Sequence, residues 1–194
     1  AGAPSWVQYA GAGSVPGLEA KLMRPWSGLD LAENWHNTDF RYYHGTVDPG
    51  PMRPAYVREL AQSLAARNIP HTAKWYETGH DLLYLVHRHG KLYAELEGVK
   101  RQQRPAEVRL VTGDYRAARQ HWLELTRFQR YPDLARLVAK VAGARLDVTS
   151  ENAAAFAIDL AESPLAGDPV ELYVDGASVF QGPRARLGAR VELV

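Results

Sequence analysis

An aspartate and a histidine occur in the order and at the spacing that an acid–base pair requires. Asp48 ends the run His44–Asp48, and His80 follows Gly79, 32 residues further along the chain. A histidine that acts as a general base needs a carboxylate that holds its imidazole in one tautomer and stabilises the cation that forms. We therefore predict a site of the Ser-His-Asp kind, in which Asp48 is the acid and His80 is the base.

Two glycines next to this pair have expected steric roles. Gly45 is expected to let the chain leave its strand tightly, and Gly79 to let backbone and imidazole approach the site without a Cβ clash. Taken singly, Asp48 also fits a simple turn in a Pro-Gly loop, and His80 an ordinary loop residue. Their joint order and placement favour the catalytic interpretation.

Strand-like and helix-like segments alternate over residues 1–103. The separation of Asp48 and His80 leaves room for a loop, a helix, a strand and a second loop between them. Such alternation predicts a parallel sheet with helices on its faces, and reacting groups in these sheets lie past the carboxyl ends of the strands. The expected strands are Phe40–His44 and Thr72–Tyr76, and the expected helices are Leu29–Trp35, Ala55–Arg67 and Leu82–Leu96.

Residues 104–194 instead contain one short strand-like segment after another. Regular spacing of such segments predicts an all-β sandwich or a jelly-roll-like domain, so the expected fold is an α/β part followed by a β domain. Asp175-Gly176 predicts a tight hairpin turn, and Trp122, on an alternating segment, is expected in the core. The expected strands are 107–112, 120–126, 134–141, 145–149, 154–160, 170–174, 178–181 and 190–194.

Composition narrows the function classes. A net charge of +1 gives no bulk attraction to nucleic acid or to an anionic membrane, and no apolar run of ~18 residues suggests a membrane span. The absence of cysteine excludes disulfides, thiolate metal sites and a cysteine nucleophile. A cytoplasmic protein and an exported, processed protein both fit this composition.

The stretch from about residue 32 to 84 resembles the end of the catalytic domain of prolyl-oligopeptidase-like serine hydrolases, which belong to the α/β-hydrolase class. The resemblance implies that Asp48 orients His80 and that His80 is the general base for a serine. One departure is Pro49-Gly50-Pro51, where the family more often has a Val-Pro step. The motifs that carry the resemblance are Ala32-Glu33-Asn34, His44-Gly45, Asp48 and Gly79-His80.

The nucleophile that the resemblance implies is missing from the sequence. A G-x-S-x-G turn is expected upstream of Asp48, because chain order in this class runs Ser, Asp, His. Ser14 lacks a preceding strand, and Ser178 lies downstream in half of the signature. We expect the nucleophile on an upstream part of the same gene product or on a second chain, so that this chain is inactive alone. A peptide or an ester is the expected substrate, and an oligomer is left open.

Other candidate sites are weaker. His80, His87 and His89 do not have zinc-ligand spacing, so no metal is expected, and no cofactor is implied. A basic group at 100–104 is expected to be a solvated linker. Trp6, Trp26 and Trp35 either line a substrate pocket or pack in the core.

A rival hypothesis makes the chain a non-catalytic binding or assembly module. In that case the β-sandwich performs the function and the α/β part is vestigial. The upstream sequence distinguishes the two hypotheses, because an intact G-x-S-x-G there favours the enzyme.

Overall fold

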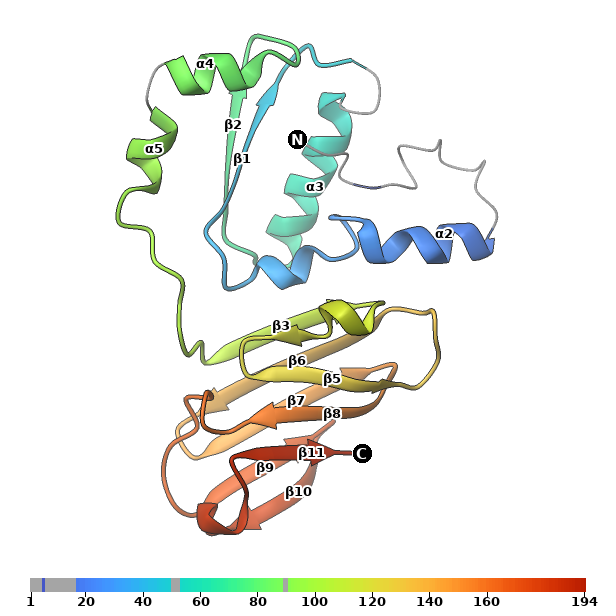
Figure 1. Cartoon of the computed structure of the whole chain (residues 1–194), viewed down its shortest axis with the longest axis vertical. Helices are drawn as coiled ribbons and strands as arrows, with labels where there is room; N and C mark the ends of the chain where they lie inside the picture. The colour runs from blue at the N-terminus through green and yellow to red at the C-terminus, as the bar shows by residue number, and fades with distance from the viewer. Residues whose placement is uncertain (1–4, 6–16, 50–52, 89–90) are drawn as a thin grey trace. The chain divides into compact units, whose positions relative to one another are not determined.

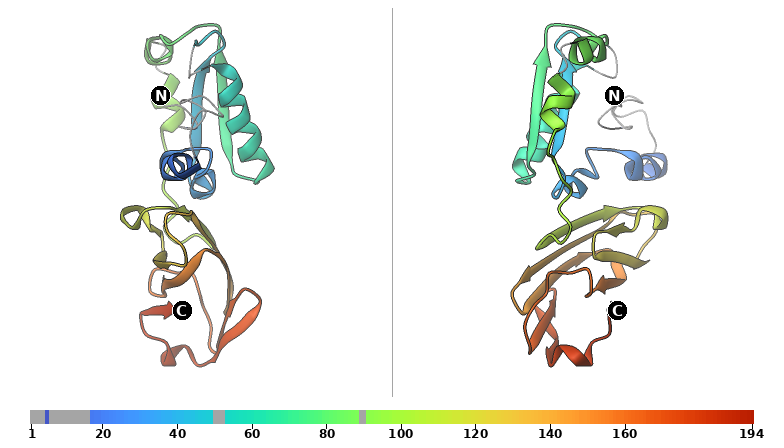
Figure 2. Two further views of the ribbon diagram at one scale, coloured as in Figure 1. Left: turned by 90° about the vertical axis from the view of Figure 1, so that its right-hand side faces the viewer. Right: turned by 60° about the vertical axis from the view of Figure 1, so that its left-hand side comes forward.

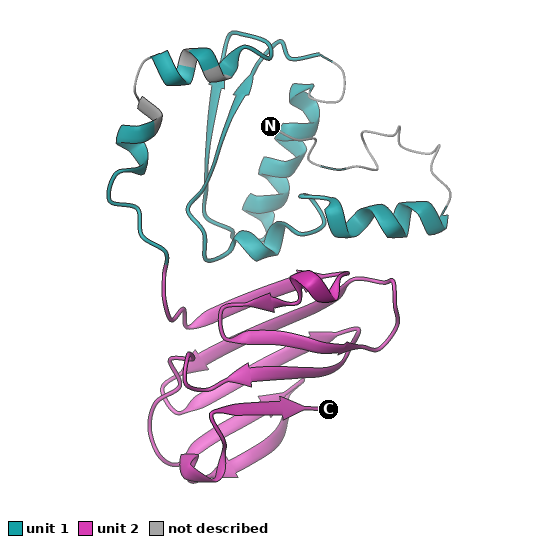
Figure 3. Ribbon diagram, viewed as in Figure 1, with its two compact units in different colours: residues 1–101 teal, residues 102–194 magenta. Residues whose placement is uncertain are grey.

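The computed structural model describes residue 5 and residues 17–49, 53–88 and 91–194. The chain divides into two compact units, residues 1–101 and 102–194 (Figure 3), close to the boundary expected at 103. With 37% of residues in strands and 25% in helices, the fold is mixed and mostly β. No helix among the described residues is long and apolar enough to cross a membrane.

Unit 1 is built around two parallel strands joined by a helix (Figure 1). The strands β1 and β2 pair in register from Phe40 opposite His71 to Gly45 opposite Tyr76. The predicted order of strand, helix and strand is confirmed. The elements are α2 (Gly17–Met23), η1 (Arg24–Trp26), η2 (Ala32–Trp35), β1 (Phe40–Gly45), α3 (Pro54–Ala66), β2 (His71–Tyr76), α4 (Leu82–Arg88) and α5 (Lys91–Leu96).

The crossover helix α3 forms because its apolar residues share one face. Pro54 stands in its first turn, where the missing N–H is not needed. Val57, Leu60 and Leu64 are buried on one side of the helix. After α3 ends, Asn68 adopts a left-handed φ of 53° and turns the chain toward β2. The helix therefore packs one apolar stripe against the sheet.

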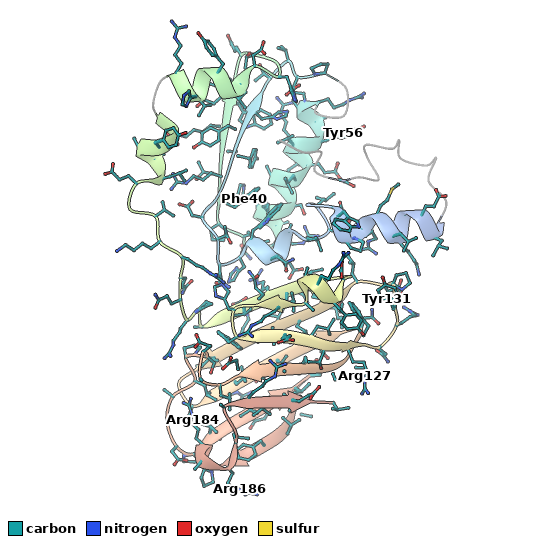
Figure 4. All side chains as sticks on the ribbon, in the orientation of Figure 1. Phe40, Tyr56, Arg127, Tyr131, Arg184 and Arg186 are labelled. Carbon is teal, nitrogen blue, oxygen red and sulfur yellow. The ribbon has the colours of Figure 1, made fainter. Side chains whose placement is uncertain are left out.

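A small core fixes the α3 side of unit 1. Leu60 and Leu64 of α3 cluster there with Ala32 and Ile69. Phe40 packs against the same cluster and stacks on Trp35 with 4.0 Å between ring centroids; Phe40 is labelled in Figure 4. This core holds the start of β1 against η2 and α3.

The opposite side of the sheet is held by polar contacts with α5. Figure 2 shows α3 on one side of the two strands and α4 and α5 on the other. Tyr43 of β1 and Lys74 of β2 both donate hydrogen bonds to the carboxylate of Glu95, and Arg41 donates to the Glu95 main-chain oxygen. The hydrogen bond from Lys74, followed by that from Tyr43, lowers the pKa of Glu95. One carboxylate thus joins both strands to α5.

Two helices differ from the prediction. The expected helix Leu82–Leu96 is two helices, α4 and α5, separated at residues 89–90, which lie outside the described residues. Of the expected helix Leu29–Trp35, only the 3-10 turn Ala32–Trp35 is helical.

Unit 2 consists of two sheets. One has the order β10-β9-β7-β6-β3 and the other β11-β8-β5-β4, and the sheets do not close into a barrel in the described part of the chain. All pairs are antiparallel except β7 with β9, which is parallel. The strands are β3 (Glu107–Thr112), β4 (Arg119–Gln120), β5 (Leu123–Phe128), β6 (Ala135–Ala142), β7 (Arg145–Glu151), β8 (Ala153–Asp159), β9 (Val170–Val174), β10 (Ala177–Gly182) and β11 (Arg190–Leu193), with the 3-10 turns η4 (Tyr115–Ala117) and η5 (Arg184–Arg186) between them.

One hydrophobic core joins these sheets. Its members come from both sheets and include Leu110, Leu137 and Leu172 on one side and Leu125 and Ile158 on the other. Because successive strand residues point to opposite faces, strands such as β3 and β6 contribute alternate residues to this core. The expectation of many short strands over residues 104–194 is confirmed.

Trp122 lies in this core, as expected, but not on a continuous strand. The expected strand 120–126 divides into β4 and β5, because His121 adopts a left-handed φ of 50° between them. Trp122 is 1% exposed, and its Nε1 donates a 2.9 Å hydrogen bond to the main-chain oxygen of Pro105. The interruption turns the indole toward the core. The hydrogen bond to Pro105 then joins the start of unit 2 to that core.

The predicted hairpin turn at Asp175-Gly176 is confirmed. Both residues have positive φ, 49° and 82°, as a two-residue turn between twisted strands requires. The Asp175 carboxylate also accepts hydrogen bonds from the backbone N–H and the hydroxyl of Ser150. The turn between β9 and β10 is thereby tied to the end of β7.

Candidate acid–base site

Asp48 and His80 meet past the carboxyl ends of β1 and β2. His80 Nδ1 lies 3.0 Å from Asp48 Oδ1 and 3.2 Å from Oδ2. The two strands are adjacent and parallel, so the loops that follow them start at the same edge of the sheet. The two side chains therefore lie within hydrogen-bonding distance, as a Ser-His-Asp arrangement requires of its acid and base. The catalytic role of the pair stays a prediction.

The two side chains differ in exposure in the way that an acid–base pair needs. The Asp48 side chain is 6% exposed, whereas the His80 side chain is 66% exposed. A carboxylate that accepts from Nδ1–H selects the tautomer whose Nε2 carries a lone pair. Within the described residues His80 has no hydrogen-bond partner other than Asp48. In that tautomer Nε2 is the ring nitrogen that can accept a proton.

Main-chain contacts hold the two loops together. The N–H of Thr46 donates to the carbonyl oxygen of Tyr76 at 2.8 Å, and the N–H of Val47 donates to that of Thr78 at 3.2 Å. These bonds continue the pairing of β1 and β2 beyond the strands. They bring the residue before Asp48 next to the residues before His80.

The close approach expected at Gly79 occurs at Gly45 instead. A Cβ on Gly45 would lie 2.2 Å from the Thr78 oxygen and 2.6 Å from the Gly79 oxygen, so the close approach occurs here. A Cβ on Gly79 would meet no described atom within 4 Å. The expectation for Gly79 is wrong in this structure, because its α-carbon points into open space while its carbonyl faces Gly45.

His44 belongs to the α3 side of the sheet. It is 4% exposed, and its ring meets the edge of Trp75 at 5.4 Å between centroids. The guanidinium group of Arg58 on α3 lies over the ring of Trp75, 5.0 Å from its centroid. These packed rings support the end of β1 below the acid–base pair.

The remaining sequence candidates do not join this site. No three His, Cys, Asp or Glu residues in the described ranges are placed to hold a metal ion. The His87 ring contacts Tyr93, and Trp35 packs on Phe40. Trp26 is 63% exposed and lines a shallow apolar pocket beside α2. The basic group at 100–104 is exposed, as expected of a solvated segment.

Several candidates cannot be placed. Ser14, Trp6 and His89 lie outside the described residues, as do Gly50 and Pro51 of the loop after Asp48. Ser178 lies on β10 of unit 2, the unit that does not contain the acid–base pair.

Comparison with known proteins identifies no relative. No protein-family model, no curated protein and no solved structure matches this chain.

Several contacts that hold the strands and loops around the pair are not marked in the sequence. Glu95 is far from both strands in sequence, and no local pattern marks it as their common partner. The carbonyl groups of Tyr76 and Thr78 act through the main chain, so their residue types carry no signal. Gly45 was recognised as a turn residue, but not as the point where the two loops touch.

Proposed function

We propose that this chain supplies the acid and the base of a serine hydrolase that cleaves a peptide or an ester. The hydrogen bond between buried Asp48 and exposed His80 carries the proposal. The order of the two residues, their place after adjacent parallel strands and the resemblance to prolyl-oligopeptidase-like enzymes support it. In this proposal the nucleophilic serine comes from an upstream part of the same gene product or from a second chain.

The chemistry follows from the position of the imidazole. Nε2 of His80 takes the hydroxyl proton as the serine oxygen attacks the carbonyl carbon of the substrate. His80 then donates that proton to the leaving amine or alcohol, and an acyl-enzyme forms. Asp48 stabilises the imidazolium in both steps. A water molecule, activated by the same nitrogen, releases the acid product and restores the serine.

The fold is consistent with a part of a larger sheet. Each strand of the two-stranded sheet has one paired edge, and within the described residues its other edge has no strand partner. Free edges favour pairing with another strand. We infer that unit 1 provides the last strands of an α/β-hydrolase sheet, and that unit 2 is an appended β-sandwich whose two sheets cover each other.

Exposed apolar side chains on unit 1 support a partner of this kind. Leu18, Leu22 and Trp26 are 64%, 49% and 63% exposed, and Val47 beside Asp48 is 69% exposed. Clustered apolar exposure marks interaction surfaces in soluble proteins. The contact with the nucleophile-bearing polypeptide should be of the obligate type, above about 2,000 Å² in total.

The decisive experiment uses the gene product that includes the upstream sequence. In serine proteases the Asp-to-Asn change lowers kcat about 10⁴-fold, so Asp48→Asn should have an effect of that order and His80→Ala a larger one. His87→Ala is the matched control, because this histidine lies on α4 and contacts Tyr93 instead of Asp48. Ester and peptide turnover that survives His80→Ala would refute the proposal.

A binding or assembly module remains the second candidate. Its supporting observation is that the core of unit 2 joins residues from both of its sheets, whereas the core of unit 1 is confined to a few residues around α3. Replacement of the upstream serine in the natural gene product, together with full stability of residues 102–194 alone, would favour this candidate.

A further inference from the structure

We infer that Gly45 is a positioning residue: its missing side chain lets the loop after β1 touch the loop after β2, and this contact preforms the Asp48–His80 pair within the chain itself. The inference rests on the proposed function only in calling the pair a general-base unit. The pairing and its cause stand on main-chain geometry.

The first step is the steric contact. The carbonyl oxygens of Thr78 and Gly79 both face the α-carbon of Gly45, and a Cβ there would lie 2.2 Å and 2.6 Å from them. An ordinary C···O contact is about 3.3 Å, so the Thr78 carbonyl would have to retreat by roughly 1 Å. Backbone atoms of a hydrogen-bonded loop cannot make that movement by a simple rotation, as a long side chain could.

The second step connects this movement to the pair. The Thr78 carbonyl that faces Gly45 also accepts the N–H of Val47, the residue before Asp48. His80 directly follows Gly79, the second residue in contact. Retreat of the Thr78–Gly79 segment therefore moves the imidazole away from a carboxylate that burial holds in place.

The displacement that a Cβ on Gly45 would cause is large compared with the tolerance of the Asp48–His80 hydrogen bonds. The imidazole–carboxylate contacts are 3.0 Å and 3.2 Å, and a hydrogen bond weakens steeply beyond about 3.5 Å. A displacement of roughly 1 Å is enough to break both contacts. One added methyl group at Gly45 should thus separate the acid from the base, although neither residue is changed.

The chain offers a matched control for this change. Gly79→Ala makes the same substitution in the partner loop, next to His80, where the added Cβ meets no described atom within 4 Å. Neither glycine contributes a group to the proposed chemistry. A difference between the two variants therefore reports the contact at Gly45 and not the loss of a glycine near the site.

The experiment measures the imidazole tautomer of His80 by ¹⁵N NMR in the full chain, at a pH where the ring is neutral. We expect the proton on Nδ1 in the unchanged chain and in Gly79→Ala, because the Asp48 carboxylate holds it there. Gly45→Ala should lose this preference and give a mixture of tautomers. The methyl signals of Leu60 and Leu64 in the α3 core show whether the unit is still folded.

Each outcome decides the inference. A mixed tautomer in the unchanged chain, or an Nδ1 proton retained in Gly45→Ala, overturns it. If Gly45→Ala does not fold, amide hydrogen exchange in the unchanged chain decides. The amides of Thr46 and Val47 should then be as protected as those that pair β1 with β2. Exchange as fast as in an open loop overturns the inference. No substrate or nucleophile enters these measurements, so failure of the proposed enzyme activity would leave their result unchanged.

Discussion

The hydroxyl of Tyr43 donates a 2.6 Å hydrogen bond to the carboxylate of Glu95 and so joins β1 to α5. Lys74 of β2 donates to the other carboxylate oxygen. α4 begins two residues after His80, and Glu95 lies on α5, the next helix along the chain. Main-chain contacts thus join the two loops that carry Asp48 and His80, and Glu95 joins α5 to the strands that precede these loops.

Unit 1 should lose stability in acid through Glu95. Hydrogen bonds from Lys74 and then Tyr43 lower the Glu95 pKa in the folded state. This stabilisation is present above the unfolded pKa and is lost as pH falls through the lower, folded pKa. Glu95→Gln should reduce the stability of unit 1 near neutrality and remove that part of its acid dependence, measured by tryptophan fluorescence during urea unfolding at several pH values.

Glu97→Gln is the control for this prediction. Glu97 follows α5 directly and is exposed, so the change removes a charge from the same region without breaking the contact to the strands. An acid dependence that is the same in Glu95→Gln as in the unchanged chain would contradict the assigned role of Glu95.

The chain alone should not turn over an activated ester faster than its histidines do in free solution. A serine-directed phosphonylating reagent should label none of its serines, because no complete G-x-S-x-G precedes Asp48. Mass spectrometry of the treated chain tests this directly. Stoichiometric labelling would show that the chain has its own nucleophile, and Ser14 is the first residue to examine.

Residues 102–194 should fold without the rest of the chain. The core of this unit is formed by residues of its own two sheets, so its apolar surface is buried without an outside partner. We expect one cooperative transition, with circular dichroism and fluorescence giving the same midpoint in urea. Non-coincident transitions, or aggregation of this fragment at low concentration, would show that the unit depends on other parts of the protein.

Trp122→Phe should destabilise that fragment by about 1–3 kcal/mol, since it leaves the buried Pro105 carbonyl without its donor. Urea unfolding of residues 102–194 gives the value. Tyr131→Phe is the control, because Tyr131 is 64% exposed and its change should have an effect within about 0.5 kcal/mol. Equal urea midpoints for the two variants would show that the Trp122 hydrogen bond does not stabilise this unit.

The parts of the fold set by local pattern could be predicted from sequence. The α3 stripe of Val57, Leu60 and Leu64 and the Asp175-Gly176 turn depend on neighbouring residues, and both occur where expected. Where a single backbone conformation interrupts a pattern, prediction failed. The left-handed φ of His121 divides an alternating segment that otherwise satisfies the strand pattern.

The positions of the two site residues could be predicted from sequence, but the contacts around them could not. The positions of Asp48 and His80 follow from strand ends, which the sequence marks with glycine and a change of pattern. The contact at Gly45 and the role of Glu95 depend on which main-chain and side-chain atoms meet after folding. Such contacts form only in the tertiary structure, so the periodicity of a single sequence does not predict them.

The order of strands in unit 2 has a consequence for synthesis of the protein. β7 pairs with β9 in parallel, whereas β8, between them in sequence, pairs with β5 and β11 in the other sheet. Both sheets thus contain strands from residues 170–194. Neither sheet can be complete before this segment has been synthesised, and such long-range pairings form slowly. A premature stop before Val170 would leave β7 and β8 each with one unpaired edge, so both sheets would have a free edge in the same nascent chain.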